Sequence, residues 1–89
     1  MPTDSQTLVE AHRKWKRANP LREWRAENGV TIHSASSMLG VSMTSIQLWE
    51  AGSAHPSREN MDKLVKVTGM PNIARRWEQW ANRNPAANL

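Results

Sequence analysis

The most constraining feature of this sequence is a tight turn between two short helical segments within residues 31–52, TIHSASSMLGVSMTSIQLWEAG. Thr31 and Ser42 each stand just before a helical segment, where a hydroxyl side chain accepts a hydrogen bond from the free N–H groups of a helix N-terminus. Gly40 lies between the segments and suits the left-handed conformation that ends a helix. The pattern therefore predicts one helix after Thr31, a turn at Gly40, and a second helix over residues 42–51.

The second predicted helix has two faces of different character. Ile46 and Trp49 fall on one face at about 100° per residue, with Glu50 beside them, and this face is expected to pack inward. The opposite face carries hydroxyl, amide and aliphatic side chains without a single charge, namely Thr44, Gln47, Leu48 and Ala51, with Met43 at its edge. The helix is thus expected to present an uncharged surface to a partner.

The composition limits the fold to a small helical domain. With 89 residues, the chain can bury one modest core. Phe and Tyr are absent while five Trp are present, so the core must consist of aliphatic side chains, Met and Trp. No stretch sustains the alternation of apolar and polar residues that a half-buried strand shows, so an all-α fold is expected.

Further helices are expected on both sides of the central pair. Thr3 and Gln6 have the spacing of a capping box, and Asn19 precedes a proline at a helix start. The four flanking helices are predicted over residues 3–18, 20–28, 57–68 and 71–83. We therefore expect an N-terminal basic helical extension, a compact domain and a flexible tail, over residues 1–19, 20–83 and 84–89.

Charge and residue usage restrict the partners. Lys and Arg outnumber Asp and Glu by 12 to 8, which favours an anionic partner, although a soluble surface alone also explains a net charge of +4. Cysteine is absent, so disulfides and thiolate metal sites are excluded. His12, His33 and His55 lack zinc-ligand spacing, and the glycines form no phosphate loop. We expect no enzyme activity and no metal, cofactor or small-molecule ligand.

The sequence carries no sign of a membrane partner. Its first residues, MPTDSQTLVE, lack the basic-then-apolar order of a signal peptide. No apolar run approaches the length of a transmembrane helix. These two observations predict a soluble protein of the cytoplasm.

A series of landmark residues keeps its spacing without a gap from Arg25 to Gly69. They are Arg25, Thr31, Leu39-Gly40-Val41-Ser42, Ile46, Trp49-Glu50, Gly52, Pro56, Leu64 and Gly69. With these landmarks, the span from about Pro20 to Met70 resembles the phage Cro and lambda-repressor-type helix-turn-helix domain, also called the Xre family. The resemblance implies a compact five-helix lambda-repressor-like domain, here with an additional N-terminal helix.

The resemblance also implies roles for individual residues. Arg25 and Glu50 match a pair that commonly forms a buried ion pair in this family and fixes the angle of the second helix. The positions that read bases in the family correspond here to Met43, Thr44, Gln47 and Leu48. Contacts to the DNA backbone are expected from the start of the preceding helix and from flanking segments, namely Thr31, Ile32, His33, Ser42, Ser45, Ser53, His55, Arg17 and Arg22.

This sequence departs from the family pattern at positions that meet DNA. Ile32 stands where the family usually has Gln, and Ala35-Ser36 replaces a usual Leu-Ala pair. No Lys or Arg occurs between residues 28 and 57, although the family commonly has them on and after the second helix. Charge for phosphates is therefore expected from the flanks: Arg13, Lys14, Lys16, Arg17 and Arg22 on one side, and Lys63 and Lys66 or Arg75 and Arg76 on the other.

Sequence-specific binding of double-stranded DNA by helix 42–51 is the leading functional prediction. Gln47 can pair bidentately with adenine, and Met43, Thr44 and Leu48 can touch thymine methyl groups, which predicts a half-site with central A·T pairs. We therefore expect a transcriptional regulator, specifically a repressor of phage, plasmid or antitoxin type. Such a protein would be associated with the nucleoid when it is bound to DNA. The alternative is a protein-interaction module that presents Met43 and Leu48 to RNA polymerase or another regulator.

The last predicted helix carries two tryptophans, Trp77 and Trp80, on one face. Small helix-turn-helix regulators generally bind two half-sites about 34 Å apart as dimers. We therefore expect a homodimer, with these two tryptophans as its candidate contact. Their burial in the core of a single chain is the equal alternative.

Overall fold

The computed structural model describes residues 4–86, with side chains from residue 7 onward. Helices are the only regular elements within this range: α1 (Asp4–Arg17), α2 (Pro20–Asn28), α3 (Ile32–Leu39), α4 (Met43–Glu50), α5 (Arg58–Thr68) and α6 (Ile73–Asn82). The expected all-α fold, a five-helix domain with an additional N-terminal helix, is confirmed. The predicted Thr3–Gln6 capping box and residues 87–89 of the predicted tail lie outside the described residues.

The helices begin where short polar side chains cap them. Asn19, Thr31, Ser42 and Ser57 each accept a hydrogen bond from a backbone N–H in the first turn of the helix that follows. The expected start of α6 at residue 71 is wrong. Residues 71 and 72 form a turn that is closed by a 3.2 Å bond from the N–H of Ile73 to the carbonyl of Met70.

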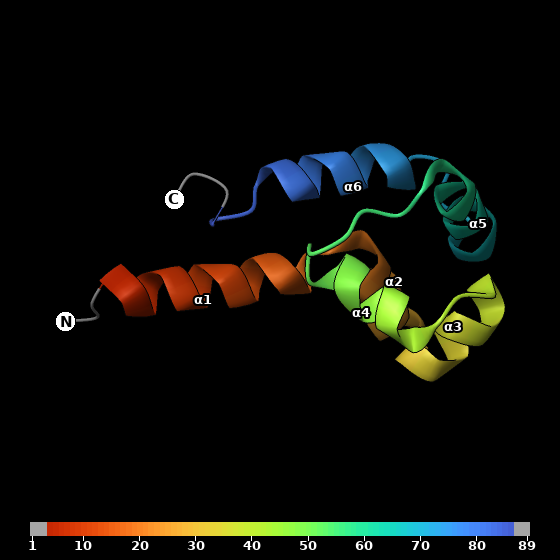
Figure 1. Ribbon diagram of the computed structural model, residues 1–89, viewed down its shortest axis with the longest axis horizontal. Helices are drawn as coiled ribbons and strands as arrows, with labels where there is room; N and C mark the ends of the chain where they lie inside the picture. The colour runs from red at the N-terminus through yellow and green to blue at the C-terminus, as the bar shows by residue number, and fades with distance from the viewer. Residues whose placement is uncertain (1–3, 87–89) are drawn as a thin grey trace.

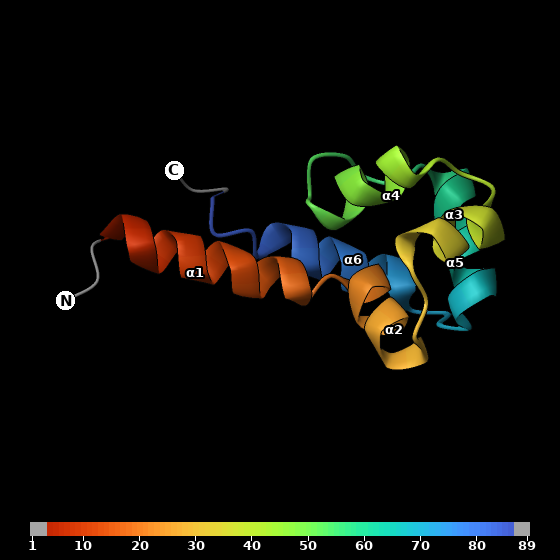
Figure 2. The ribbon, with the colours of Figure 1, turned by 90° about the horizontal axis from the view of Figure 1, so that it is seen from below.

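The six helices form an elongated body with extents of 44 × 23 × 21 Å. In two perpendicular views, α1 points away from the cluster of α3, α4 and α5 and extends beyond α6 (Figure 1, Figure 2). Both ends of the described chain therefore lie at the same end of the molecule (Figure 1). None of the helices within residues 4–86 is long and apolar enough to cross a membrane.

One hydrophobic core connects all six helices. Its buried members are Trp15, Leu21, Ala35, Leu39, Ile46, Trp49, Met61, Leu64, Ile73, Trp77 and Trp80. These are aliphatic side chains, Met and Trp, as the composition requires. Because a single residue of α1 belongs to this set, the rest of that helix contributes no buried hydrophobic side chain among residues 7–17.

Trp77 and Trp80 belong to the core and not to a dimer contact. Their side chains are only 1% and 5% exposed. Trp80 stacks on Trp15, with ring centroids 4.2 Å apart and planes within 1°, and Trp77 meets Trp80 edge to face at 5.8 Å. The prediction of a dimer contact at these residues is therefore wrong, because rings of the same chain cover them, and the alternative is correct.

Candidate nucleic-acid interface

Arg25 and Glu50 form the predicted ion pair. Nε of Arg25 donates to Oε2 of Glu50 at 2.8 Å, and Nη2 donates to Oε1 at 2.6 Å. A third bond runs from Nη1 to the carbonyl of Val30 at 3.2 Å. The hydrogen bonds to Glu50 raise the pKa of Arg25, against the opposing effect of burial, and the negative charge of Glu50 raises it further. The planar guanidinium group of Arg25 thus links α2 to the end of α4 and to the segment before α3.

The helices α3 and α4 are joined by only three residues, 40–42. Gly40 ends α3 with φ 65°, a left-handed conformation that side chains other than glycine rarely adopt. Ser42 then caps α4 through a 3.0 Å bond from the N–H of Ser45. Ala35 is fully buried in α3, which packs against both α4 and α5. A small side chain there allows the neighbouring helices to approach closely.

The two faces of α4 are as predicted. Ile46 is 0% exposed and Trp49 is 5% exposed, so this face is closed by the core. On the other side, Met43 and Leu48 are 47% and 43% exposed, and Thr44 and Gln47 are exposed as well. The helix therefore offers amide, hydroxyl and apolar groups outward while its inner face and its end are held in place.

The residues that build this arrangement are matched by a family model whose description is helix-turn-helix, over residues 21–71. This match covers more than half of the 89 residues. The chain belongs to the Cro and lambda-repressor-type helix-turn-helix family. No curated protein and no solved structure matches the chain. Its helix-turn-helix domain is a DNA-binding domain of transcriptional regulators, and the family is not an enzyme family.

A groove of about 290 Å³ opens beside α4, the second helix of the helix-turn-helix pair. It is lined by Lys16, Arg22, Arg25, Ile32, Gln47, Glu50 and Ala51. The structure thus brings together three residues that were expected at the DNA interface, Arg22, Ile32 and Gln47. It also adds Lys16 from α1, which the sequence indicated only as one of several flanking charges.

The other residues that were expected to contact phosphates lie outside this groove. Lys63, Lys66, Arg75 and Arg76 lie on α5 and α6 and do not line this groove. Thr31, His33, Ser42 and Ser53 are exposed near the helix-turn-helix pair, and the hydroxyls of Ser42 and Ser45 bond each other at 3.0 Å. Arg17 is exposed at the end of α1 but is not a lining residue.

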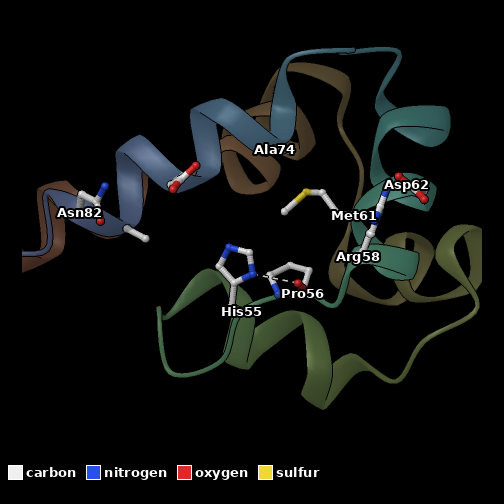
Figure 3. Close-up of a pocket in the computed structure, with 9 residues that line it drawn as sticks. His55, Pro56, Arg58, Met61, Asp62, Ala74 and Asn82 are labelled. Atoms are coloured by element: carbon white, nitrogen blue, oxygen red, sulfur yellow. Dashed lines mark hydrogen bonds between the residues drawn. The ribbon is translucent and has the colours of Figure 1, made fainter.

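His55 lines a different and larger cavity, of about 700 Å³ (Figure 3). The cavity lies between the loop after α4 and helices α5 and α6, and its wall comprises His55, Pro56, Arg58, Met61, Asp62, Ala74, Glu78, Ala81 and Asn82. Nδ1 of His55 lies 2.8 Å from the carbonyl oxygen of Pro56. The structure therefore does not bring His55 to the groove that holds Gln47.

Trp15 places the end of α1 next to the helix-turn-helix domain. Its indole Nε1 donates to the carbonyl of Trp80 at 2.6 Å, and Nε1 of Trp80 donates to the carbonyl of Trp15 at 2.7 Å. Gly52, with φ 76°, lies under the Trp15 ring, and a Cβ atom at Gly52 would overlap that ring. Sequence reasoning could not place Lys16, because its position depends on this packing between distant segments.

Proposed function

We propose that this protein is a sequence-specific regulator that binds double-stranded DNA by inserting α4 into the major groove. The difference between the two faces of α4 is the observation that supports this function. Its outward residues are exposed, while Ile46, Trp49 and the Arg25–Glu50 pair hold the opposite side. A helix that is fixed in this way can present the same side chains to every duplex without reordering, which favours specific recognition.

The chemistry of the outward face fits base edges rich in A·T pairs. The Gln47 amide can donate to and accept from the adenine edge, and Met43, Thr44 and Leu48 suit the thymine methyl group. The amide N–H groups of Ile32 and His33 have no acceptor within the described residues. At the positive end of α3 they are suited to a DNA phosphate, as at other helix N-termini.

The protein binds as a homodimer to two half-sites about 34 Å apart. Because Trp77 and Trp80 are buried, the contact between subunits must use another surface. We also infer from the family resemblance that the protein represses transcription by occluding a promoter in a phage, plasmid or antitoxin operon. Sedimentation of the protein with and without a bound duplex tests the dimer, and a reporter gene behind a selected site tests the direction of regulation.

Selection of bound duplexes from a random pool tests the reading role of α4. We expect Gln47→Ala to relax the preference at one base position, because a bidentate pair contributes about 1–3 kcal/mol of discrimination. Gln79→Ala is the matched control, since Gln79 is an exposed amide on α6. If Gln47→Ala selects the same sequences as the wild type, Gln47 is not a base-reading residue.

A second candidate function is supported by the apolar character of the same region. Met38, Met43 and Leu48, on α3 and α4, are 51%, 47% and 43% exposed. Such side chains also suit a protein partner, for example RNA polymerase or another regulator. Binding to random duplex at low salt separates the two functions, because phosphate contacts alone give a DNA-binding protein measurable affinity. Undetectable binding would exclude the DNA function and favour the protein partner.

A further inference from the structure

The sequence segment that forms α3 and the recognition helix α4 lacks the positive charge that DNA binding requires. No Lys or Arg occurs between residues 28 and 57. Neutralisation of phosphates by Lys and Arg supplies a large share of the affinity of most DNA-binding proteins. The cations for this domain must therefore come from elements outside its helix-turn-helix pair.

The groove beside α4 supplies two such cations, Lys16 and Arg22. They line the same opening as Gln47. Neither makes an ion pair or a side-chain hydrogen bond within the described part of the chain. Arg25, the third cation of the groove, is held by both oxygens of Glu50. Lys16 and Arg22 are thus the charges of the groove that are free to meet an anion.

The position of Lys16 is set by its neighbour Trp15. Trp15 is 6% exposed, stacks on Trp80 and lies against Gly52, the second residue after α4. The end of α1 is therefore fixed relative to the end of the recognition helix. Trp15 and Lys16 both lie outside residues 21–71, so this arrangement is an addition to the part of the chain that the family model matches.

The helical period separates the basic residues of α1 into two sides. Arg13, three residues before Lys16, lies about 60° from it around the helix and so continues the same side. Lys14, one of the flanking charges that the sequence indicated for phosphates, lies about 160° from Lys16, on the opposite side, and does not line the groove, so it is not part of the surface beside α4. Both Arg13 and Lys14 are exposed. The helix thus offers a test residue and a control residue of the same charge.

We propose that α1, docked through Trp15, is a rigid clamp for the DNA backbone beside the bases that α4 reads. This inference rests on the proposed function of α4. Lys16 and Arg22 contact phosphates next to the base pair that Gln47 meets, and Arg13 extends the contact along α1. The clamp supplies the positive charge that α4 lacks, without reading sequence.

The salt dependence of binding to random duplex tests the clamp. The logarithm of the binding constant falls with the logarithm of salt concentration by about 0.9 per neutralised phosphate. We expect Lys16→Gln and Arg22→Gln each to reduce this slope by about 1, and the double variant by about 2. Lys16→Arg should keep the wild-type slope, and Lys14→Gln should match the wild type. The sequences selected from a random pool should be the same for all of these variants.

The outcomes separate the clamp from the proposed function. If Lys16→Gln and Lys14→Gln show the same slope while Gln47→Ala changes the selected sequences, the clamp is wrong and the reading role of α4 stands. If the wild type binds no duplex at low salt, both are wrong. Circular dichroism of each variant establishes that a changed slope is not caused by unfolding. If Lys16→Gln fails to fold, the salt-dependence slopes of Arg22→Gln and Arg13→Gln are compared with the slope of Lys14→Gln. Slopes equal to that of Lys14→Gln would show that the clamp is wrong.

Discussion

Trp15 and Trp80 donate their indole N–H groups to each other's backbone carbonyl oxygens, at 2.6 and 2.7 Å, while their rings stack at 4.2 Å. The pair joins residues that are 65 positions apart in the chain. Both indole donors are satisfied inside the core, where an unpaired polar group costs about 1–3 kcal/mol. This reciprocal contact makes the end of α1 part of the helical domain.

Substitution Trp15→Phe should reveal this contact. It removes one indole N–H and part of a buried ring, so the carbonyl of Trp80 keeps only its bond from the N–H of Arg83. We expect the free energy of unfolding to fall by about 1–3 kcal/mol, measured by guanidinium denaturation. Trp24→Phe is the control, because Trp24 is only partly buried and donates no hydrogen bond to the described residues. Equal losses in the two variants would show that the indole bond contributes nothing specific.

Gly52→Ala should cost more stability than Gly29→Ala. Both glycines have positive φ, 76° and 64°, so alanine strains the backbone at either position. A Cβ atom at Gly52 would overlap the Trp15 ring, whereas nothing lies within 4 Å of a Cβ atom at Gly29. We expect the overpacking at Gly52 to add about 1–3 kcal/mol to the loss, measured by urea denaturation.

The same pair of glycines provides an internal check on the packing of Trp15. In a Trp15→Ala background the ring is gone, so Gly52→Ala should cost no more than Gly29→Ala. A penalty at Gly52 that persists in this background would mean that Trp15 is not what the new Cβ atom meets.

The Arg25–Glu50 pair should show strong coupling in a double-mutant cycle. Removal of Arg25 leaves the buried carboxylate of Glu50 without compensation, so Arg25→Met should lower the free energy of unfolding by about 3–5 kcal/mol. Glu50→Leu should lower it by less, because the Arg25 side chain is only partly buried. The double variant should lose much less than the sum of the two, because neither charge remains. Additive losses in urea denaturation would argue against a buried ion pair.

The pH dependence of this coupling follows from the raised pKa of Arg25. A cation whose pKa is raised by folding contributes stability that is present below its unfolded pKa and is lost as pH rises through its folded pKa. An arginine side chain keeps its proton at neutral and moderately alkaline pH even in the unfolded chain. The coupling energy from the double-mutant cycle should therefore stay constant from neutral pH to about pH 10. A decline across this range would contradict the assignment.

Asn19→Ala should be more destabilising than Asn72→Ala. Oδ1 of Asn19 accepts hydrogen bonds from the N–H groups of Leu21 and Arg22, each at 3.0 Å, whereas Asn72 makes no side-chain cap bond before α6. Loss of such a cap costs about 0.5–2 kcal/mol, while an exposed surface residue usually changes stability by less than about 0.5 kcal/mol. Thermal unfolding of the two variants measures the difference, and similar midpoints would show that the Asn19 cap is unimportant.

Local features of the domain could be predicted from the sequence because they depend on neighbouring residues. Thr31 and Ser42 cap the helices that follow them, and Gly40 adopts the left-handed conformation that ends α3. Ile46 and Trp49 are buried on one face of α4 because the helical period places them together. The Arg25–Glu50 pair was implied by the family resemblance, since its partners are 25 residues apart and no local pattern joins them.

Sequence alone determined the caps of α2 to α5 and the outward face of α4, because hydrogen bonds within a turn and the helical period are local, but it placed the start of α6 two residues too early. Only the tertiary structure decided what covers each apolar face. An apolar stripe such as Trp77 and Trp80 has the same spacing whether its own chain or a second copy buries it, and here Trp15 of the same chain covers Trp80. That contact also brings Lys16 to the groove of Gln47, since packing between distant segments follows from their shape and not from their order in the chain.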